Sequence, residues 1–374
     1  MSNTQNAAEE RIPVTVLTGF LGSGKTTLLN KLLRRPELSD TAVIINEFGE
    51  IGLDHLLVES SNDETILMAS GCLCCTIRGD LVSTLEDLLR KRDNGRITAF
   101  QRVIIETTGL ADPAPVLHAI MYHPYLLMRF RLDGVVTLVD AVNGAHTLDA
   151  HQEAMKQAAV ADRLVLTKTD LVTDARSLEA LRARLTALNP TARVLDAGRG
   201  EATAAALLDA GLFDLSRKSP DVGRWLNDEA FALMDARGHR HDHDVNRHDA
   251  RIRAFCLTSG EPMRRSGFDL FLDLLRQAHG PKLLRVKGIV GLDDDAERPV
   301  VIHGVQHVFH PPVRLERWPD ADRRTRIVFI LRDLEPRFVE GLWNAFSGVP
   351  AVDSPDAAAL ARNPLKPSTG GLLD

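Results

Sequence analysis

The chain has 374 residues, a formal net charge of −6, 44% hydrophobic residues and 26% charged residues. These values are ordinary for a globular protein of two or three domains. The acidic balance disfavours nucleic acid as a partner, because no domain-wide excess of Lys and Arg is present. No window approaches the roughly 18 apolar residues of a membrane span, and the polar N-terminus does not resemble a signal peptide. We therefore expect a cytoplasmic protein without a membrane partner.

The first 215 residues alternate between apolar runs and amphipathic stretches. Short apolar runs predict buried strands at residues 12–18, 42–46, 102–106, 134–140 and 162–168. The stretches between them predict helices at residues 26–35, 81–92, 113–124 and 178–190. Strands that alternate with helices predict an α/β domain over residues 12–215, with a mostly parallel sheet flanked by helices.

The remaining residues predict a second, smaller domain and segments without regular structure. Residues 1–11, 216–250 and 347–374 are expected to be a disordered N-terminus, a His-rich linker and a flexible tail. Residues 251–346 show the pattern of a strand, a helix, three strands and a final helix. This order predicts a small α+β domain in which antiparallel strands carry helices on one face.

The first predicted strand leads directly into the sequence GFLGSGKTT, which starts at Gly19. The sequence matches the pattern G-x-x-x-x-G-K-[ST], and a predicted helix follows it, which makes this a P-loop. Glycines let the backbone approach a polyphosphate, and amides at the helix N-terminus supply positive potential. We expect Lys25 to reach the β- and γ-phosphates and the Thr26 hydroxyl to bind Mg²⁺. The loop residues expected to contact the nucleotide are Gly19, Gly22, Ser23, Gly24, Lys25, Thr26 and Thr27.

The sequence TKTD, at the end of the fifth predicted strand, indicates which base is bound. It resembles the N/T-K-x-D motif by which P-loop GTPases recognise guanine. Asp170 is able to accept hydrogen bonds from guanine N1–H and from the exocyclic amine, a pair that adenine does not offer. Lys168 is expected to lie over the purine, and Thr167 stands where Asn is commoner. The predicted nucleotide is therefore GTP, and an ATP-driven, kinase-like enzyme is disfavoured.

Glu106 ends the third predicted strand, in the sequence IIETTGLADP. A carboxylate at this place faces the Mg²⁺ side of a P-loop, so Lys25, Thr26 and Glu106 form the predicted catalytic set. Gly109 is expected to donate its amide to the γ-phosphate, in a Glu-x-x-Gly sequence where Asp-x-x-Gly is more familiar. No glutamine that positions the attacking water and no arginine finger is evident. Slow intrinsic hydrolysis of GTP is therefore expected.

Three of the four cysteines lie in the sequence GCLCC, as Cys72, Cys74 and Cys75. Thiolates this close in a turn are suited to one soft ion such as Zn²⁺, and Cu(I) or Co²⁺ also fits. The fourth ligand is expected from Glu47, Glu50 or a partner protein. The alternatives are small buried hydrophobic residues or a redox pair, and a disulfide between adjacent cysteines is strained.

Histidines form two further groups. His239, His241 and His243 lie in the predicted linker, where imidazoles are able to capture borderline metals weakly. The alternative is a solvated linker of unusual composition. His303 and His307 are four residues apart on a predicted strand and would share one face. With His310 nearby they are candidates to bind a metal or a partner, and the commoner alternative is that they are half-exposed surface residues.

In chain order, GFLGSGKTTLLN, NEFGEIGLD, GCLCC, IETTGLADP and TKTD resemble the CobW family of P-loop GTPases. The sequences PKLLRVKG and HGVQHVFH resemble the C-terminal domain of that family, and the resemblance covers roughly residues 12–345. It implies a GTPase that binds Zn²⁺ or Co²⁺ at Cys-x-Cys-Cys and couples GTP hydrolysis to metal delivery. A client metalloprotein and a nucleotide-dependent homodimer are the partners it suggests.

Three functions follow from these patterns. The first is a zinc metallochaperone whose nucleotide state sets the geometry of the cysteine site. The second is a cobalt-directed GTPase that serves cobalamin synthesis or nitrile hydratase maturation. The third is a passive zinc-binding or storage protein in which the P-loop is structural. Metal preference distinguishes the first from the second, and a GTPase assay distinguishes both from the third.

Overall fold

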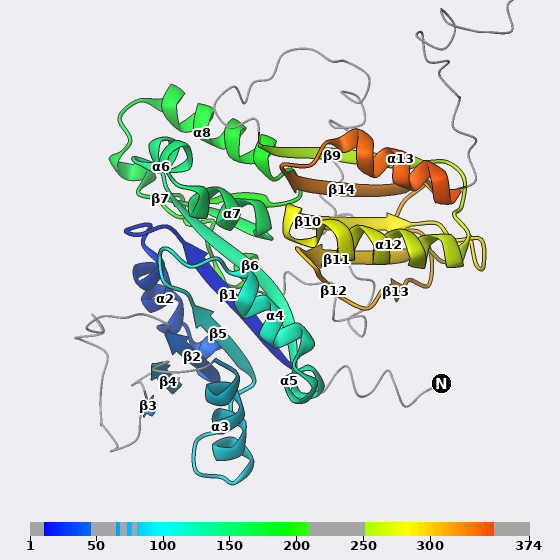
Figure 1. Ribbon diagram of the computed structural model, residues 1–374. Coiled ribbons are helices and arrows are strands. Elements are labelled where there is room, and N and C mark those ends of the chain that lie inside the picture. The colour runs from blue at the N-terminus through cyan, green and yellow to red at the C-terminus, as the bar shows by residue number, and fades with distance from the viewer. Residues whose placement is uncertain (1–10, 46–64, 68–72, 77–80, 209–250, 348–374) are drawn as a thin grey trace, which may run out of the picture.

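The structure is a computed structural model that describes residues 11–45, 65–67, 73–76, 81–208 and 251–347 (Figure 1). The predicted N-terminal segment, linker and tail lie almost entirely outside these residues. The described residues form two sheets, each with its own helices. Figure 1 shows them side by side, with the first sheet in blue to green and the second in yellow to orange.

The first sheet has the strand order β3-β4-β2-β5-β1-β6-β7-β8. The strands in chain order are β1 (Ile12–Gly19), β2 (Thr41–Ile45), β3 (Thr65–Leu67), β4 (Leu73–Thr76), β5 (Arg102–Glu106), β6 (Phe130–Asp140), β7 (Arg163–Thr167) and β8 (Arg193–Asp196). Neighbouring strands pair in parallel, except that β3 is antiparallel to β4. The five predicted strands and the parallel sheet are confirmed, whereas β3, β4 and β8 were not predicted.

Helices cover both faces of this sheet, as a mostly parallel arrangement requires. The helices are α2 (Lys25–Leu33), α3 (Leu81–Asp93), α4 (Ala114–Tyr122), α5 (Pro124–Arg129), α6 (Gly144–Ala150), α7 (Gln152–Val160), α8 (Ala175–Leu188) and α9 (Ala204–Leu207), with short 3₁₀ turns η1 (Pro36–Leu38) and η2 (Thr169–Leu171). Strand residues alternate between faces, so Val43 and Ile45 pack towards α2 whereas Ala42 and Ile44 pack towards α3 and α4. The core therefore lies on both sides of the central strands.

The second sheet is antiparallel, with the order β12-β11-β10-β14-β9 and β13 beside β11. Its elements are β9 (Ile252–Ser259), α12 (Arg265–His279), η3 (Gly280–Lys282), β10 (Leu283–Val290), β11 (Val300–Val305), β12 (Val308–Phe309), β13 (Val313–Arg314), β14 (Thr325–Arg332) and α13 (Pro336–Ser347). Helices α12 and α13 pack on one face through Phe268, Phe271 and Trp343. The predicted antiparallel sheet with helices on one face is confirmed. Cys256 of β9 is half-buried.

One of the three strands predicted after the first helix of this domain, over residues 299–310, is not a single strand. The structure has a hairpin there. Strand β11 ends at Val305, and Gln306 takes a left-handed φ of 55° in the turn before β12. His303 and His307 therefore do not share a strand face. His303 is buried and stacks on His310 at 5.1 Å between ring centroids, whereas the exposed His307 lies 5.1 Å from the ring of His118 in α4.

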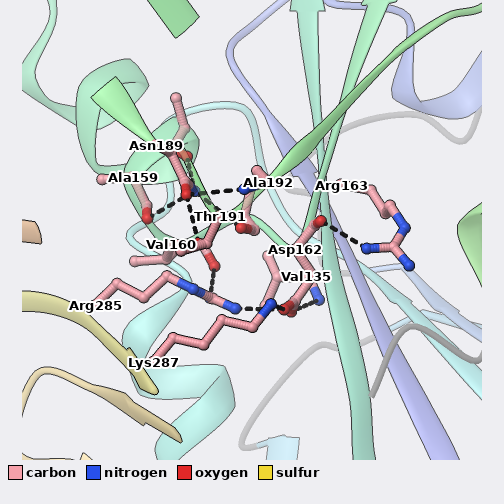
Figure 2. A network of polar contacts seen from close by, with 12 residues as sticks. Val135, Ala159, Val160, Asp162, Arg163, Asn189, Thr191, Ala192, Arg285 and Lys287 are labelled. Atoms are coloured by element: carbon pink, nitrogen blue, oxygen red, sulfur yellow. Dashed lines mark hydrogen bonds and ion pairs between the residues drawn. The ribbon is translucent and has the colours of Figure 1, made fainter. Parts of the chain in front are cut away.

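The other face of the second sheet packs against the first domain. Helices α7 and α8 share an apolar cluster with Ile252, Leu284 and Ile330 of the second sheet. A buried polar network lies beside this cluster (Figure 2). Asp162 at the start of β7 forms an ion pair with Arg285 of β10, and Lys287 Nζ lies 3.8 Å from the same carboxylate. Arg285 also donates to the carbonyl of Val160, so one guanidinium joins both ends of the short α7–β7 connection to the second sheet.

Ionisation in this network is set by burial and by neighbouring charges. Burial alone favours the neutral acid, but the positive charges of Arg285 and Lys287 prevail and hold the pKa of Asp162 well below its usual range. A backbone N–H of Val135 also donates to this carboxylate at 2.9 Å. Burial lowers the pKa of Lys287, although the nearby Asp162 works in the opposite direction. The carboxylate of Asp162 is therefore ionised and held from both domains.

Candidate nucleotide and metal site

The P-loop connects β1 to α2. Gly19 ends β1, residues 20–24 form the loop, and Lys25 begins the helix. Gly24 is the N-cap residue of α2 and has a φ of 88°, a left-handed conformation that suits glycine because it lacks a Cβ. The first amides of α2 consequently face out of the loop at the positive end of the helix dipole. This arrangement is an anion-binding site of the kind that phosphate groups occupy.

Lys25 is buried and its side chain folds back over the loop. Its ammonium donates to the carbonyls of Gly19 and Phe20, at 3.0 and 3.3 Å. The positive charge is therefore held at the loop itself, where it adds to the potential of the backbone amides. The arrangement favours a highly charged anion such as a polyphosphate.

Thr26 and Glu106 meet although they lie 80 residues apart in the sequence. The Thr26 hydroxyl donates to Oε1 of Glu106 at 2.8 Å, and Glu106 is fully buried. Parallel pairing explains the meeting, because Glu106 is in register with Leu17 of β1, just before the P-loop. A hydroxyl and a carboxylate are the hard oxygen donors that Mg²⁺ prefers. The two predicted metal-side residues therefore fit that ion.

The segment after Glu106 forms a tight turn against the P-loop. Thr107 N–H donates to the carbonyl of Leu17 at 3.0 Å, and Ala111 N–H donates to the carbonyl of Thr108 at 3.1 Å. A Cβ on Gly109 would come within 2.7 Å of backbone atoms of Leu21, which is closer than side chains tolerate. Gly109 thus lets this turn press directly on the loop that carries Lys25.

The TKTD sequence ends β7 beside the same loop. The Thr167 hydroxyl donates to the carbonyl of Ser23 at 2.8 Å and also lies 3.3 Å from the carbonyl of Val139. This contact gives a physical reason for threonine where asparagine is commoner, since the hydroxyl ties the base-recognition segment to the P-loop. Lys168 has a left-handed φ of 57°, and Asp170 is exposed in η2. The Asp170 carboxylate is therefore accessible to a ligand.

Asp140, which the sequence analysis missed, holds Lys168 in place. Its carboxylate accepts from Lys168 Nζ at 2.7 Å and from the backbone N–H groups of Val142 and Asn143. Burial by itself would raise the pKa of Asp140, but these hydrogen bonds outweigh it and lower the pKa below its usual value. A carboxylate at the carboxyl end of a predicted strand, level with TKTD, was the available sequence signal.

Gln157 is a second polar residue that the sequence analysis missed. It lies on α7, is only 1% exposed, and donates to the carbonyls of Gly109 and Ala111 at 3.2 and 2.9 Å. Helix α7 itself was not predicted. The available signal was an amide side chain three residues after Ala154, on the helix face that is buried.

A cavity of about 280 Å³ lies on the α6–α7 side of the P-loop. P-loop residues 20–23, the end of β6 and both helices line it, and Gln157 and Lys168 are on its wall. Lys25 and Thr26 are not among its lining residues, so the cavity is distinct from the phosphate-facing side of the loop.

Cys74 and Cys75 lie in strand β4, so the expectation that they lie in a turn was wrong. Strand β4 pairs in parallel with β2, and Cys75 is in register with Ile44. Among the residues that the structure describes, no group of three or more His, Cys, Asp or Glu side chains forms a metal site. The other predicted metal ligands, Cys72, Glu47, Glu50, His239, His241 and His243, lie outside the described residues.

None of the helices in the described ranges is long and apolar enough to cross a membrane.

Comparisons with known proteins agree with this architecture. The family model "CobW/HypB/UreG, nucleotide-binding domain" matches residues 13–196, and "Cobalamin synthesis protein cobW C-terminal domain" matches residues 252–347. The zinc chaperone YjiA of Escherichia coli K12 is 33% identical over 321 residues, which cover 85% of this chain and 93% of YjiA. The zinc chaperone CobW of a Sinorhizobium species is 31% identical over 318 residues, covering 70% and 86% of the two chains.

A solved structure extends the likeness to three dimensions. The crystal structure of zinc-bound YjiA GTPase from E. coli superposes with a TM-score of 0.64 at 30% identity. The match covers 90% of this chain and 99% of that one. Since sequence and fold agree along almost the whole length of these relatives, the chain belongs to the CobW family of P-loop GTPases.

Proposed function

We propose that this GTPase binds zinc through Cys72, Cys74 and Cys75 and that its nucleotide state controls transfer of the ion to a client metalloprotein. Support comes from relatives that are named zinc chaperones and from the solved relative that carries zinc. The arrangement of the first sheet supplies the physical link between the zinc ion and the nucleotide.

Position in the sheet is the observation that carries the proposal. Ile45 at the end of β2 is in register with Glu106 of β5 on one side and with Thr76 of β4 on the other. Cys75 lies one residue earlier in β4, so its backbone is about two strand spacings, roughly 10 Å, from the strand that ends at Glu106. In the sequence, Ile45 is followed closely by Glu47 and Glu50.

On the nucleotide side, the roles follow from the geometry of the P-loop. Backbone amides from Gly19 to Thr27 hold the phosphates, and Lys25 stabilises negative charge on the β- and γ-phosphates. The Thr26 hydroxyl and Glu106 would hold Mg²⁺, which supplies charge neutralisation when it is bound. Gly109 donates its N–H to the γ-phosphate.

On the base side, Asp170 accepts from guanine while Lys168, held by Asp140, covers the ring. Thr167 keeps this segment attached to the P-loop through its bond to Ser23. No side chain among the described residues in these contacts is a strong general base for water. Slow turnover of GTP is therefore the expected behaviour, and it suits a switch better than a rapid catalyst.

Zinc is the cargo, and thiolates are ligands that this ion favours. Three protein thiolates leave one position of a tetrahedral ion for Glu47, Glu50 or a client ligand, so the ion is exchangeable in principle. The His239–His243 segment is proposed as a weak accessory reservoir. Coupling requires that zinc affinity differs between the GTP and GDP states, because a ligand that binds two states equally well does not change their relative populations.

Zinc affinity in each nucleotide state tests the proposal. Chelator competition under reducing conditions would compare the GDP complex with the complex of a non-hydrolysable GTP analogue. We expect at least about a tenfold difference, a coupling of roughly 1.4 kcal/mol. Replacing Cys72, Cys74 and Cys75 by Ser should abolish the difference, whereas Cys256→Ser, a matched control in the second sheet, should leave it intact.

Other outcomes have defined meanings. Equal zinc affinities in both states, with no GTP hydrolysis, would contradict the switch and favour a storage protein. A clear preference for Co²⁺ over Zn²⁺ in anaerobic competition would favour the cobalt-directed alternative. Retained coupling in the triple cysteine variant would place the zinc site elsewhere in the chain.

A further inference from the structure

We propose that Gln157 is a positioning residue for GTP hydrolysis, because it fixes the turn that presents Gly109 to the γ-phosphate. The inference rests on the role of Gly109 given above and adds a residue that has no part in the P-loop or TKTD motifs. It depends on described residues alone, within α7 and the segment after β5.

Both donor hydrogens of the Gln157 amide are used on this turn. Nε2 donates to the carbonyl of Gly109 at 3.2 Å and to the carbonyl of Ala111 at 2.9 Å. The side chain is 1% exposed, so the two bonds form without competition from water. One side chain therefore fixes the turn at two points.

The Gln157 bonds and one backbone hydrogen bond within the turn together determine where its backbone N–H groups point. In a trans peptide the N–H is directed opposite to the C=O of the same plane. The carbonyl of Thr108 is used by Ala111 N–H, and this bond sets the direction of Gly109 N–H. The carbonyl of Gly109 is used by Gln157, and this bond sets the direction of Leu110 N–H away from α7. The donors are thus oriented before a nucleotide arrives, as electrostatic stabilisation of a transition state requires.

Helix α7 is itself immobilised, which makes it an effective anchor. Its last residue, Val160, accepts a hydrogen bond from Arg285 of the second sheet (Figure 2). One residue before Gln157, Lys156 forms an ion pair with Asp112 at 3.0 Å. Asp112 follows the turn directly and also lies 3.5 Å from Nε2 of Gln306 in the β11–β12 turn. Gln157 therefore holds the turn on a helix that the second domain braces.

A purely structural role for Gln157 makes a different prediction from a positioning role. A buried amide that only satisfies two carbonyls would affect thermal stability, and the kinetics of a folded variant would be unchanged. Replacing a positioning residue affects the complex that contains a γ-phosphate more than the GDP complex. The replacement also lowers kcat with little change in KM, because the lost interaction acts in the transition state.

The test replaces Gln157 with Glu, which keeps the size and removes both donors. We expect kcat for GTP to fall about tenfold or more, with KM and GDP affinity changed by no more than about threefold. Affinity for a non-hydrolysable GTP analogue should fall more than affinity for GDP. Gln152→Glu, the same substitution at an exposed position of α7, is the matched control and should behave like the wild type.

Gln157→Met is the second variant, because it preserves length and burial without a donor and without a new charge. All assays would run at a temperature at which circular dichroism shows the variants folded. Unchanged kcat and an unchanged ratio of analogue to GDP affinity in either folded variant would overturn the inference.

The assays contain no zinc, so this inference and the proposed function fail separately. Lys25→Ala is the reference for the nucleotide site. If the wild type does not hydrolyse GTP, or if Lys25→Ala hydrolyses it equally well, the proposed function itself is wrong. If Lys25→Ala is inactive and the Gln157 variants match the wild type, the inference alone is wrong.

Discussion

Replacing Arg285 by Met should strongly destabilise the protein, because it breaks the buried ion pair between the two domains. Arg285 and Asp162 are 1% and 2% exposed, so water cannot replace the lost partner. The substitution also removes the hydrogen bond to the carbonyl of Val160. Lys287, 3.8 Å from Asp162, compensates only in part, since burial lowers the pKa of its ammonium.

The expected loss is large relative to the stability of a typical domain. Removing one partner of a buried pair costs about 3–5 kcal/mol, whereas domains unfold with about 5–15 kcal/mol. The matched control is Arg276→Met, which breaks the exposed pair between Arg276 and Asp273 on α12. Pairs of that kind contribute about 0–1 kcal/mol, so the two variants should differ by several kcal/mol.

Urea unfolding followed by circular dichroism measures this difference. The double variant Asp162→Asn with Arg285→Met should lose less than the sum of the two single variants, because neither member of this pair is then left buried without the other. A loss below about 1 kcal/mol for Arg285→Met would refute the reasoning. It would mean that the pair is solvated in solution or that the junction opens without cost to either domain.

Two further predictions concern buried or bonded ionisable groups. Burial lowers the pKa of His310 to about 3, below its ordinary value when unfolded, so the free energy of unfolding should fall as pH drops below about 6.5. The loss approaches about 1.4 kcal/mol per pH unit, and His310→Phe should reduce it in unfolding measured from pH 7 to 5. An unchanged slope would contradict a neutral His310 imidazole in the folded protein. Asp140→Asn should weaken GDP and GTP affinity alike, by about tenfold, because Lys168 loses its ionic anchor. Fluorescence titration measures both affinities, and values unchanged from the wild type would show that Lys168 does not cover the base.

The sequence predicted the P-loop because the motif is local. The strand, the glycines and the helix start follow one another within a few residues, and their conformations depend on neighbours in the chain. Glu106 was placed correctly because an acid at the end of a buried parallel strand has few alternatives. Its contact with Thr26 then follows from the register of β5 with β1.

Features that depend on distant partners were not predictable in the same way. Helix α7 carries a weak apolar pattern, and the role of Gln157 appears only when the turn at Gly109 lies beside it. Strand β4 is short and forms because β2 lies alongside, so Cys74 and Cys75 were assigned to a turn. The hairpin at Gln306 was read as one strand because apolar residues flank the turn on both sides and its left-handed position is occupied by Gln306 and not by a glycine.

The strand order of the first sheet fixes how far apart the cysteines, the P-loop and the contact to the second domain lie across the sheet. Strand β4, with its cysteines, lies near one margin, and β7, which carries the buried contact to the second domain, lies near the other. A nucleotide bound at the end of β1 lies about 15 Å from the first and about 10 Å from the second, by the spacing of strands. The cysteines and the buried contact to the second domain therefore lie on opposite sides of β1. The contact also lies at the amino end of β7, at Asp162, whereas the P-loop lies beside the carboxyl end of that strand at Thr167. In the proposed function, a client that approaches the cysteine side of this sheet would therefore not compete for space with the second domain.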